Sequence, residues 1–340
     1  MLEDTIQSAI NTAHGSSIKF LKTDDWIRRT HSFTSACQLS PRPGVFKAVL
    51  MKTLLGFLFF ALSTAAIAHP GGGIIPLSEN SAIIADSVEN FIWLVEKGQE
   101  AKRLVSNFHG HWLTRCLDGN LYAEKFQASG GVWNSAAFRL DLPAAKLTEV
   151  APRDDVKALV FAVDRDGSLV FQRGASLVSR RNSEVLPFRP SPAQPKLENV
   201  TAYAWTRDDD LVFADRNRIY RMNSKGLTTL IAEIKGKVLE PKIWNATDTP
   251  AIFGLAIDNA GRVLATVPAL EKVYRVDKNH ALKEIACSEN GWRATGIGVF
   301  GDSIFLLESN SSKSTSPRVR ILRANGNIDR LTVATTKTKN

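Results

Sequence analysis

Two histidines spaced two residues apart, His109 and His111, are the residues whose type and spacing best suit chemistry in this sequence. On a β-strand, side chains at positions i and i+2 point to the same side, so both imidazoles would face one ligand. Such a pair can bind zinc or copper, or one ring can act as a general base. Because no third metal ligand occurs at an equivalent place elsewhere in the chain, the pair also suits the polar wall of a channel. We predict no metal site and keep both histidines as candidate ligand-binding residues.

Three tryptophans in stretches without a strand pattern form a second set of candidates: Trp133, Trp244 and Trp292. An indole ring in a loop offers a flat surface on which a sugar, a peptide or a small apolar molecule can stack. The alternative is that each ring caps the end of a hydrophobic core. Trp244 and Trp292 fit this alternative better, because each comes shortly before a predicted strand.

Other motifs indicate no specific reaction. Residues 164–167 and 208–210 resemble pieces of a calcium loop but lack the later bidentate glutamate, and they suit hairpin turns better. The sequence contains no Gly-Lys-Ser phosphate loop and no Gly-x-Ser-x-Gly nucleophile motif. We therefore predict no cofactor, and a divalent cation in a central channel is the alternative.

Residues 51–68 predict export. Lys52 is followed by an apolar run, and Ala66 and Ala68 supply the small residues that a signal peptidase requires. The run is too short for a membrane span, which takes roughly 20 residues. We interpret residues 1–50 as an upstream extension, either wrongly included or disordered. The expected location is periplasmic or extracellular.

Composition narrows the classes of partner. The formal net charge is +9, but the charged residues are scattered and mostly alternate in sign. The sequence has no run of basic residues of the kind that binds along a phosphate backbone, so we expect no nucleic-acid partner. Cys116 and Cys287 lie within the exported part, and we expect both to be buried thiols that behave as small apolar residues.

A repeated pair of hairpins predicts the elements that position these residues. Runs such as ALVFAVD and SLVFQR flank an Asp-Gly turn, and a second hairpin such as LVSRR and EVLPF follows. The second hairpin recurs six times, at an average spacing of about 46 residues. Four strands in that length make one blade of a β-propeller. We predict an all-β, six-bladed propeller with four antiparallel strands per blade over residues 69–333, and a flexible tail at 334–340. A two-sheet sandwich is the alternative.

Residues 253–258, 261–263 and 272–277, which read FGLAID, GRV and KVYRVD, resemble an NHL repeat. This repeat is typical of six-bladed propellers of the gluconolactonase-like and strictosidine-synthase-like group. The resemblance implies a divalent cation held in the channel by a Glu, Asn-type ligands and an Asp. At the matching places this chain has His109-Gly110-His111, Phe253 and Thr295, and a phenylalanine cannot bind a hard cation. The metal-ligand motif is therefore absent, and Phe253 and Thr295 are expected at the channel mouth with the histidines.

Strand direction predicts which face carries a site. Four long segments, 127–135, 187–198, 235–249 and 308–317, should all lie on the face where the inner strand of each blade begins. We call this the near face. Long loops on a rigid scaffold are where binding residues concentrate.

We predict a monomeric exported binding or scaffold protein that recognises a sugar, a peptide or a small apolar molecule on the near face, without a stable membrane span. A lactonase or lyase with an atypical channel site is the alternative, and a structural role in surface assembly is a third.

Overall fold

The computed structural model describes residues 72–117, 119–129, 132–151, 160–192, 194–238, 250–289, 291–310 and 317–333. All of them belong to one compact unit, Ala68–Asn340. The predicted upstream extension, signal peptide and tail lie outside the described residues.

Twenty-four described strands form six antiparallel sheets of four, and each sheet is ordered as its strands follow in the chain. The first three sheets contain β1 (Ile74–Ser78), β2 (Ser81–Asp86), β3 (Phe91–Glu96), β4 (Lys102–Ser106), β5 (Leu113–Arg115), β6 (Leu121–Ser129), β7 (Val132–Asp141), β8 (Lys146–Ala151), β9 (Ala162–Val163), β10 (Leu169–Arg173), β11 (Ser176–Arg181) and β12 (Glu184–Pro187). The last three contain β13 (Val200–Trp205), β14 (Leu211–Asp215), β15 (Arg218–Met222), β16 (Thr228–Glu233), β17 (Gly254–Ile257), β18 (Val263–Val267), β19 (Lys272–Val276), β20 (Leu282–Cys287), β21 (Trp292–Phe300), β22 (Ser303–Asn310), β23 (Arg318–Leu322) and β24 (Ile328–Thr332), with a short 3₁₀ helix, η1 (Pro268–Leu270), between β18 and β19.

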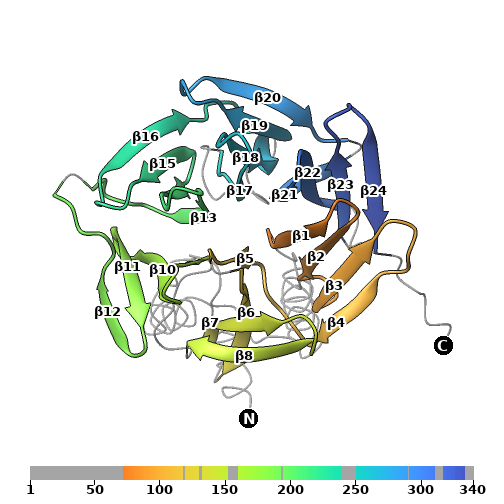
Figure 1. Cartoon of the computed structure of the whole chain (residues 1–340), viewed down its shortest axis with the longest axis horizontal. Coiled ribbons are helices and arrows are strands. Elements are labelled where there is room, and N and C mark those ends of the chain that lie inside the picture. The colour runs from red at the N-terminus through yellow and green to blue at the C-terminus, as the bar shows by residue number, and fades with distance from the viewer. Residues whose placement is uncertain are drawn as a thin grey trace, which may run out of the picture. The chain divides into compact units, whose positions relative to one another are not determined.

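The six sheets are arranged around a common centre with their first strands innermost (Figure 1). This is the predicted six-bladed β-propeller. The second strand of a blade is the most deeply buried, as in β2, β14 and β18, where every residue is buried. These strands read as continuous apolar runs because neighbouring blades cover both of their faces. The fourth strands lie on the rim of the ring. Buried and exposed residues do not alternate regularly along them, and most residues of β4 and β8 are exposed.

The ring closes without strand exchange, because blade 1 comes wholly from β1–β4 and blade 6 wholly from β21–β24. Side chains of the two blades share one apolar cluster that includes Ile74, Trp93 and Phe305. Polar contacts add to it, since Lys97 bonds Asp329 at 2.7 Å. The inner strand β1 contains a proline, Pro76, at a break in its register with β2, which is where a strand tolerates proline.

Two expectations about the long segments were wrong. Residues 127–135 are not an irregular loop, because the ladder between β6 and β7 continues to the pair Ser129 and Val132 and satisfies the backbone groups. The segment 187–198 does not stay on the near face. Arg189 reaches the turn between β13 and β14, where its guanidinium bonds Asp209 at 3.0 Å. It also lies 5.3 Å from the ring of Trp205, so a charge contact and a cation–π contact draw the connection across the blade.

Backbone packing at the centre yields a first prediction. A methyl group on Gly296 of β21 would collide with the carbonyl oxygen of Gly72, which is backbone and cannot rotate away. We expect Gly296→Ala to lower the free energy of unfolding by about 3 kcal/mol, the upper end of the range for overpacking. Chemical denaturation measures this. The control is Gly98→Ala, where φ is +75° and space is open, and the expected loss is about 1 kcal/mol. Equal losses would contradict the packing argument.

Candidate functional site

The chain itself fills the centre of the ring at the near-face ends of the inner strands. The amide of Gly72 donates a 2.7 Å hydrogen bond to the carbonyl of His111. A methyl group on Gly72 would lie 3.2 Å from the carbonyl oxygens of both Phe253 and Thr295. Backbone from blades 1, 2, 5 and 6 therefore meets here. Of the four residues expected at the channel mouth, three approach one another through Gly72.

The two histidines lie in the connection before β5 and not on a strand, which corrects the expected geometry. Their rings nevertheless meet edge to face, with centroids 5.1 Å apart and planes at 88°. Both residues are half-buried. His109 Nδ1 lies 2.7 Å from the side-chain oxygen of Asn90, which belongs to the turn between β2 and β3. The side chain of Asn90 in blade 1 thus orients the imidazole ring of His109, which lies directly before blade 2.

Glu124, on β6, completes this cluster and was missed by the sequence interpretation. Its side chain is fully buried and accepts a 3.0 Å hydrogen bond from the backbone amide of His111. The same carboxyl oxygen lies 3.9 Å from His111 Nδ1. Its other oxygen, Oε1, has no hydrogen-bond partner among the described residues. The only available signal was a glutamate in the otherwise apolar beginning of the strand LYAEKFQAS.

Burial raises the pKa of Glu124 to about 8, and the hydrogen bond from His111 opposes only part of this rise. Removing a carboxylate from water disfavours its charged form, and no arginine or lysine in the described part of the chain forms an ion pair with Glu124. At neutral pH the group is mainly a carboxylic acid that can donate a proton. A strongly raised pKa beside a histidine is a recognised feature of functional sites.

The remaining predicted residues lie apart from this cluster or outside the description. Thr295 is fully buried in β21, where its hydroxyl donates to the carbonyl of Leu307 at 3.4 Å. Phe253 is half-buried, and its amide donates to the carbonyl of Thr266 at 3.0 Å. Trp133 is part of β7, but its side chain lies outside the description. Trp244 lies outside the described residues.

Trp292 begins β21 and is half-buried. The guanidinium of Arg318 lies 4.5 Å from its ring centroid, so one ring face already has a cation–π partner. Asn310 of β22 pairs with it across the ladder. The structure therefore places Trp292 in the packing between β21 and β23, with an arginine where a stacked ligand was expected.

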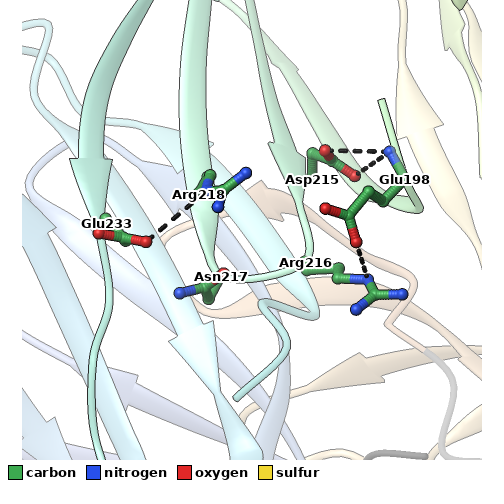
Figure 2. Close-up of a pocket in the computed structure, with 6 residues that line it drawn as sticks. All are labelled: Glu198, Asp215, Arg216, Asn217, Arg218 and Glu233. Atoms are coloured by element: carbon green, nitrogen blue, oxygen red, sulfur yellow. Dashed lines mark hydrogen bonds and ion pairs between the residues drawn. The ribbon is translucent and has the colours of Figure 1, made fainter. Parts of the chain in front are cut away.

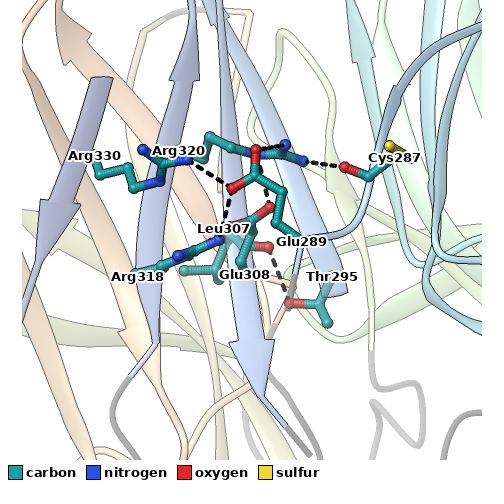
Figure 3. Close-up of polar contacts among 8 residues, drawn as sticks. All are labelled: Cys287, Glu289, Thr295, Leu307, Glu308, Arg318, Arg320 and Arg330. Atoms are coloured by element: carbon teal, nitrogen blue, oxygen red, sulfur yellow. Dashed lines mark hydrogen bonds and ion pairs between the residues drawn. The ribbon is translucent and has the colours of Figure 1, made fainter. Parts of the chain in front are cut away.

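A network of charged residues holds the blade 6 strands to the connection before them (Figure 3). The carboxylate of Glu308, fully buried, lies 2.7 Å from Arg318 Nε and 2.8 Å from Arg320 Nε. Glu289 joins the network through Arg320 at 3.1 Å and Arg330 at 2.7 Å. The hydrogen bond from Arg330 is the main reason that the pKa of Glu289 is lowered. These charges satisfy one another, so the network serves the fold.

The two cysteines behave differently. Cys116 is buried, as expected, and its thiol lies 3.1 Å from the carbonyl oxygen of Asp164. Cys287 is exposed, so the expectation of a second buried thiol was wrong. It lies on β20, the fourth strand of blade 5.

Among the described residues, no three His, Cys, Asp or Glu side chains are grouped closely enough to hold a metal ion. The described part of the chain also contains no helix of the length and hydrophobicity that crossing a membrane requires.

Comparisons with known proteins identify the fold. No family model matches the sequence, and no curated protein matches it. Solved structures do resemble it. A PQQ-bound aldose sugar dehydrogenase from Streptomyces coelicolor is 16% identical, with a TM-score of 0.52, over 78% of this chain and 94% of that one. A gluconolactonase from Xanthomonas campestris is 10% identical, with a TM-score of 0.50, over 71% and 85%.

A chain of the nidogen/laminin complex is also similar, at 13% identity and a TM-score of 0.53, over 74% of this chain and 92% of that one. Enzymes and a chain of the nidogen/laminin complex thus share this architecture. At such identity the likeness supports the propeller fold alone, and the function has to be argued from the site itself.

The burial of Glu124 predicts an unusual pH dependence of stability. Its pKa is higher in the folded chain, about 8, than the ordinary 4.5, so the folded state holds the proton more tightly than the unfolded state. Its contribution is fully present below pH 4.5 and is lost as the pH rises toward 8, at up to about 1.4 kcal/mol per pH unit. Urea denaturation at several pH values should show that Glu124→Gln gains stability relative to the natural chain as the pH rises.

The control is Glu149→Gln, which changes an exposed glutamate of the same blade. Its stability should run parallel to that of the natural chain. Parallel curves for Glu124→Gln as well would show that the carboxyl group ionises normally.

Proposed function

We propose that this chain is an exported binding protein that takes a small polar ligand on its near face, at the cluster of His109, His111 and Asn90. The observation that carries the proposal is the meeting of two half-buried imidazoles next to a fully buried carboxyl group, which among the described residues has no cationic side-chain partner other than His111. Such an arrangement costs stability, because buried polar groups are expensive unless they are fully hydrogen-bonded.

The chemistry of the cluster favours a ligand that forms hydrogen bonds. Imidazole and amide groups both donate and accept, and the neutral Glu124 adds a buried proton donor beneath them. Hydroxyl groups of a sugar or the backbone of a peptide offer donors and acceptors that match these groups, whereas a small apolar molecule offers none. Because backbone of blades 1, 2, 5 and 6 meets at Gly72, we place the ligand beside this contact, at the histidine cluster.

Acid–base catalysis, as in a lactonase or a lyase, is a second candidate that one observation favours. Glu124 can hold a proton at neutral pH, and His111 lies next to it. A proton donor with a pKa near the working pH is what general acid catalysis needs. In this alternative the same mouth would bind a substrate, and Glu124 would pass its proton through His111.

Residues 51–68 support export, which would place the propeller in the periplasm or outside the cell, and we propose that it acts there as a monomer. Sequencing the amino terminus of the secreted protein would locate the cleavage site. A mature chain that begins at His69 is the expected result.

Replacing His109 tests the binding proposal. Purified chain is screened against monosaccharides, oligosaccharides and short peptides by thermal shift, and each hit is measured by calorimetry. We expect His109→Ala to weaken binding at least tenfold, about 1.4 kcal/mol, through loss of a hydrogen bond at the mouth. The control is His280→Ala, since this exposed histidine lies in the turn between β19 and β20 on the opposite face. Equal effects of the two changes would count against the site.

The catalytic alternative is separated by Glu124→Gln. If the chain hydrolyses lactones or eliminates from an ester, this variant should lose at least a hundredfold in kcat, since a general acid contributes about that much or more. A binding protein would show no turnover in the natural chain.

A further inference from the structure

A tight turn in blade 4 contains an arginine in a conformation that favours glycine. Arg216 has φ of +55° and, with Asn217, links the paired residues Asp215 and Arg218. The equivalent two-residue turn of blade 3 begins with Gly174, whose φ is +60°. A side chain in this region carries a steric cost that glycine avoids. Strain of this kind persists where the side chain has a use.

The arginine borders a pocket of about 180 Å³ on the near face (Figure 2). Its wall consists of charged and amide residues: Glu198, Asp215, Arg216, Asn217, Arg218 and Glu233. Two ion pairs lie on opposite sides of Asn217 in the figure. Arg216 lies 3.1 Å from Glu198, and Arg218 lies 3.6 Å from Glu233.

Two of the lining residues hold the pocket in shape. Asp215 is buried, and its carboxylate accepts the backbone amides of Glu198 at 3.1 Å and Asn199 at 2.6 Å. Asn217 is also buried, and its amide donates to the carbonyl of Ile234 at 3.0 Å. The connection that carries Glu198 and the turn that carries Arg216 are therefore fixed from below.

Two of the four charged side chains have a further partner, because Lys235 lies 3.4 Å from Glu233 and Tyr220 hydrogen-bonds Arg218. The four side chains of the two pairs are between 34% and 48% exposed, and ion pairs in such positions contribute little to stability. A ligand that carries both charges can replace both partners at low cost, with a carboxylate on the arginines and an ammonium on the glutamates. No aromatic side chain is among the described residues that line the pocket, so a sugar ring would find no stacking surface.

The volume of the pocket narrows the class of ligand further. Pockets for drug-sized ligands hold roughly 300–1,000 Å³, and this one is smaller. We propose that the pocket between Glu198, Arg216, Arg218 and Glu233 is a binding site for a small zwitterion, namely a free α-amino acid. This site lies in blade 4, and the inference does not depend on the ligand proposed for the histidine cluster of blade 2.

The test is calorimetric titration of the full-length chain, at low salt, with each of the common L-amino acids. At least one should bind, and its N-acetyl and carboxamide derivatives, which each lack one charge, should bind at least tenfold more weakly. Arg216→Gly should abolish measurable binding while it maintains or raises the melting temperature, because glycine relieves the strained turn. If Arg216 had only a structural role, Arg216→Gly would change the melting temperature and the binding affinity together.

Two control variants and one further test variant make the outcome decisive. Arg139→Ala, an exposed arginine on β7, should leave amino-acid binding unchanged. His109→Ala should also leave it unchanged, so failure of the histidine site and failure of this pocket are distinguishable. Glu198→Gln should weaken binding at least tenfold. The proposal is overturned if no amino acid binds, if the derivatives bind equally well, or if Arg216→Gly keeps its affinity.

Discussion

Close approach of backbone at the centre of the ring is the constraint on which the rest of the structure depends. A methyl group on Gly296 would collide with the backbone of Gly72, and a methyl group on Gly72 would crowd the carbonyl oxygens of Phe253 and Thr295. This contact lets blade 1 seat against blade 6 although the ring exchanges no strand. The same contact positions the segment of His111, because the amide of Gly72 donates a hydrogen bond to the carbonyl of His111. Closure of the ring and assembly of the candidate site are thus consequences of the same packing.

Two buried glutamates show how the same fold treats a charge in different ways. Glu308 on β22 and Glu124 on β6 both lie on the second strand of a blade and are fully buried. Two arginines neutralise Glu308, and such a pair contributes to specificity more surely than to stability. Glu124 has a backbone amide and a histidine ring instead. Glu124 therefore holds the segment of His111 through a carboxyl group whose pKa is raised by burial, whereas Glu308 is neutralised by charge.

The sequence predicted the architecture because propeller blades repeat, and six weak signals at a regular spacing reinforce one another. It predicted the meeting of His111, Phe253 and Thr295 for the same reason, since strand starts gather around the axis. Glu124 escaped notice because its burial depends on blades distant in the chain. The extension of β6 and β7 into a long hairpin and the exposure of Cys287 depend likewise on neighbours that no local pattern reveals.

Departures from the repeat therefore mark where this propeller differs from a bare scaffold. The second strand of blade 2 contains the fully buried Glu124, and the tight turn of blade 4 contains Arg216 where the equivalent turn of blade 3 has Gly174. Each residue has a local cost: Arg216 has a positive φ in a turn on the near face, and Glu124 is buried against the backbone amide of His111. Because folding alone favours neither residue, both agree with the two sites that we propose for this face.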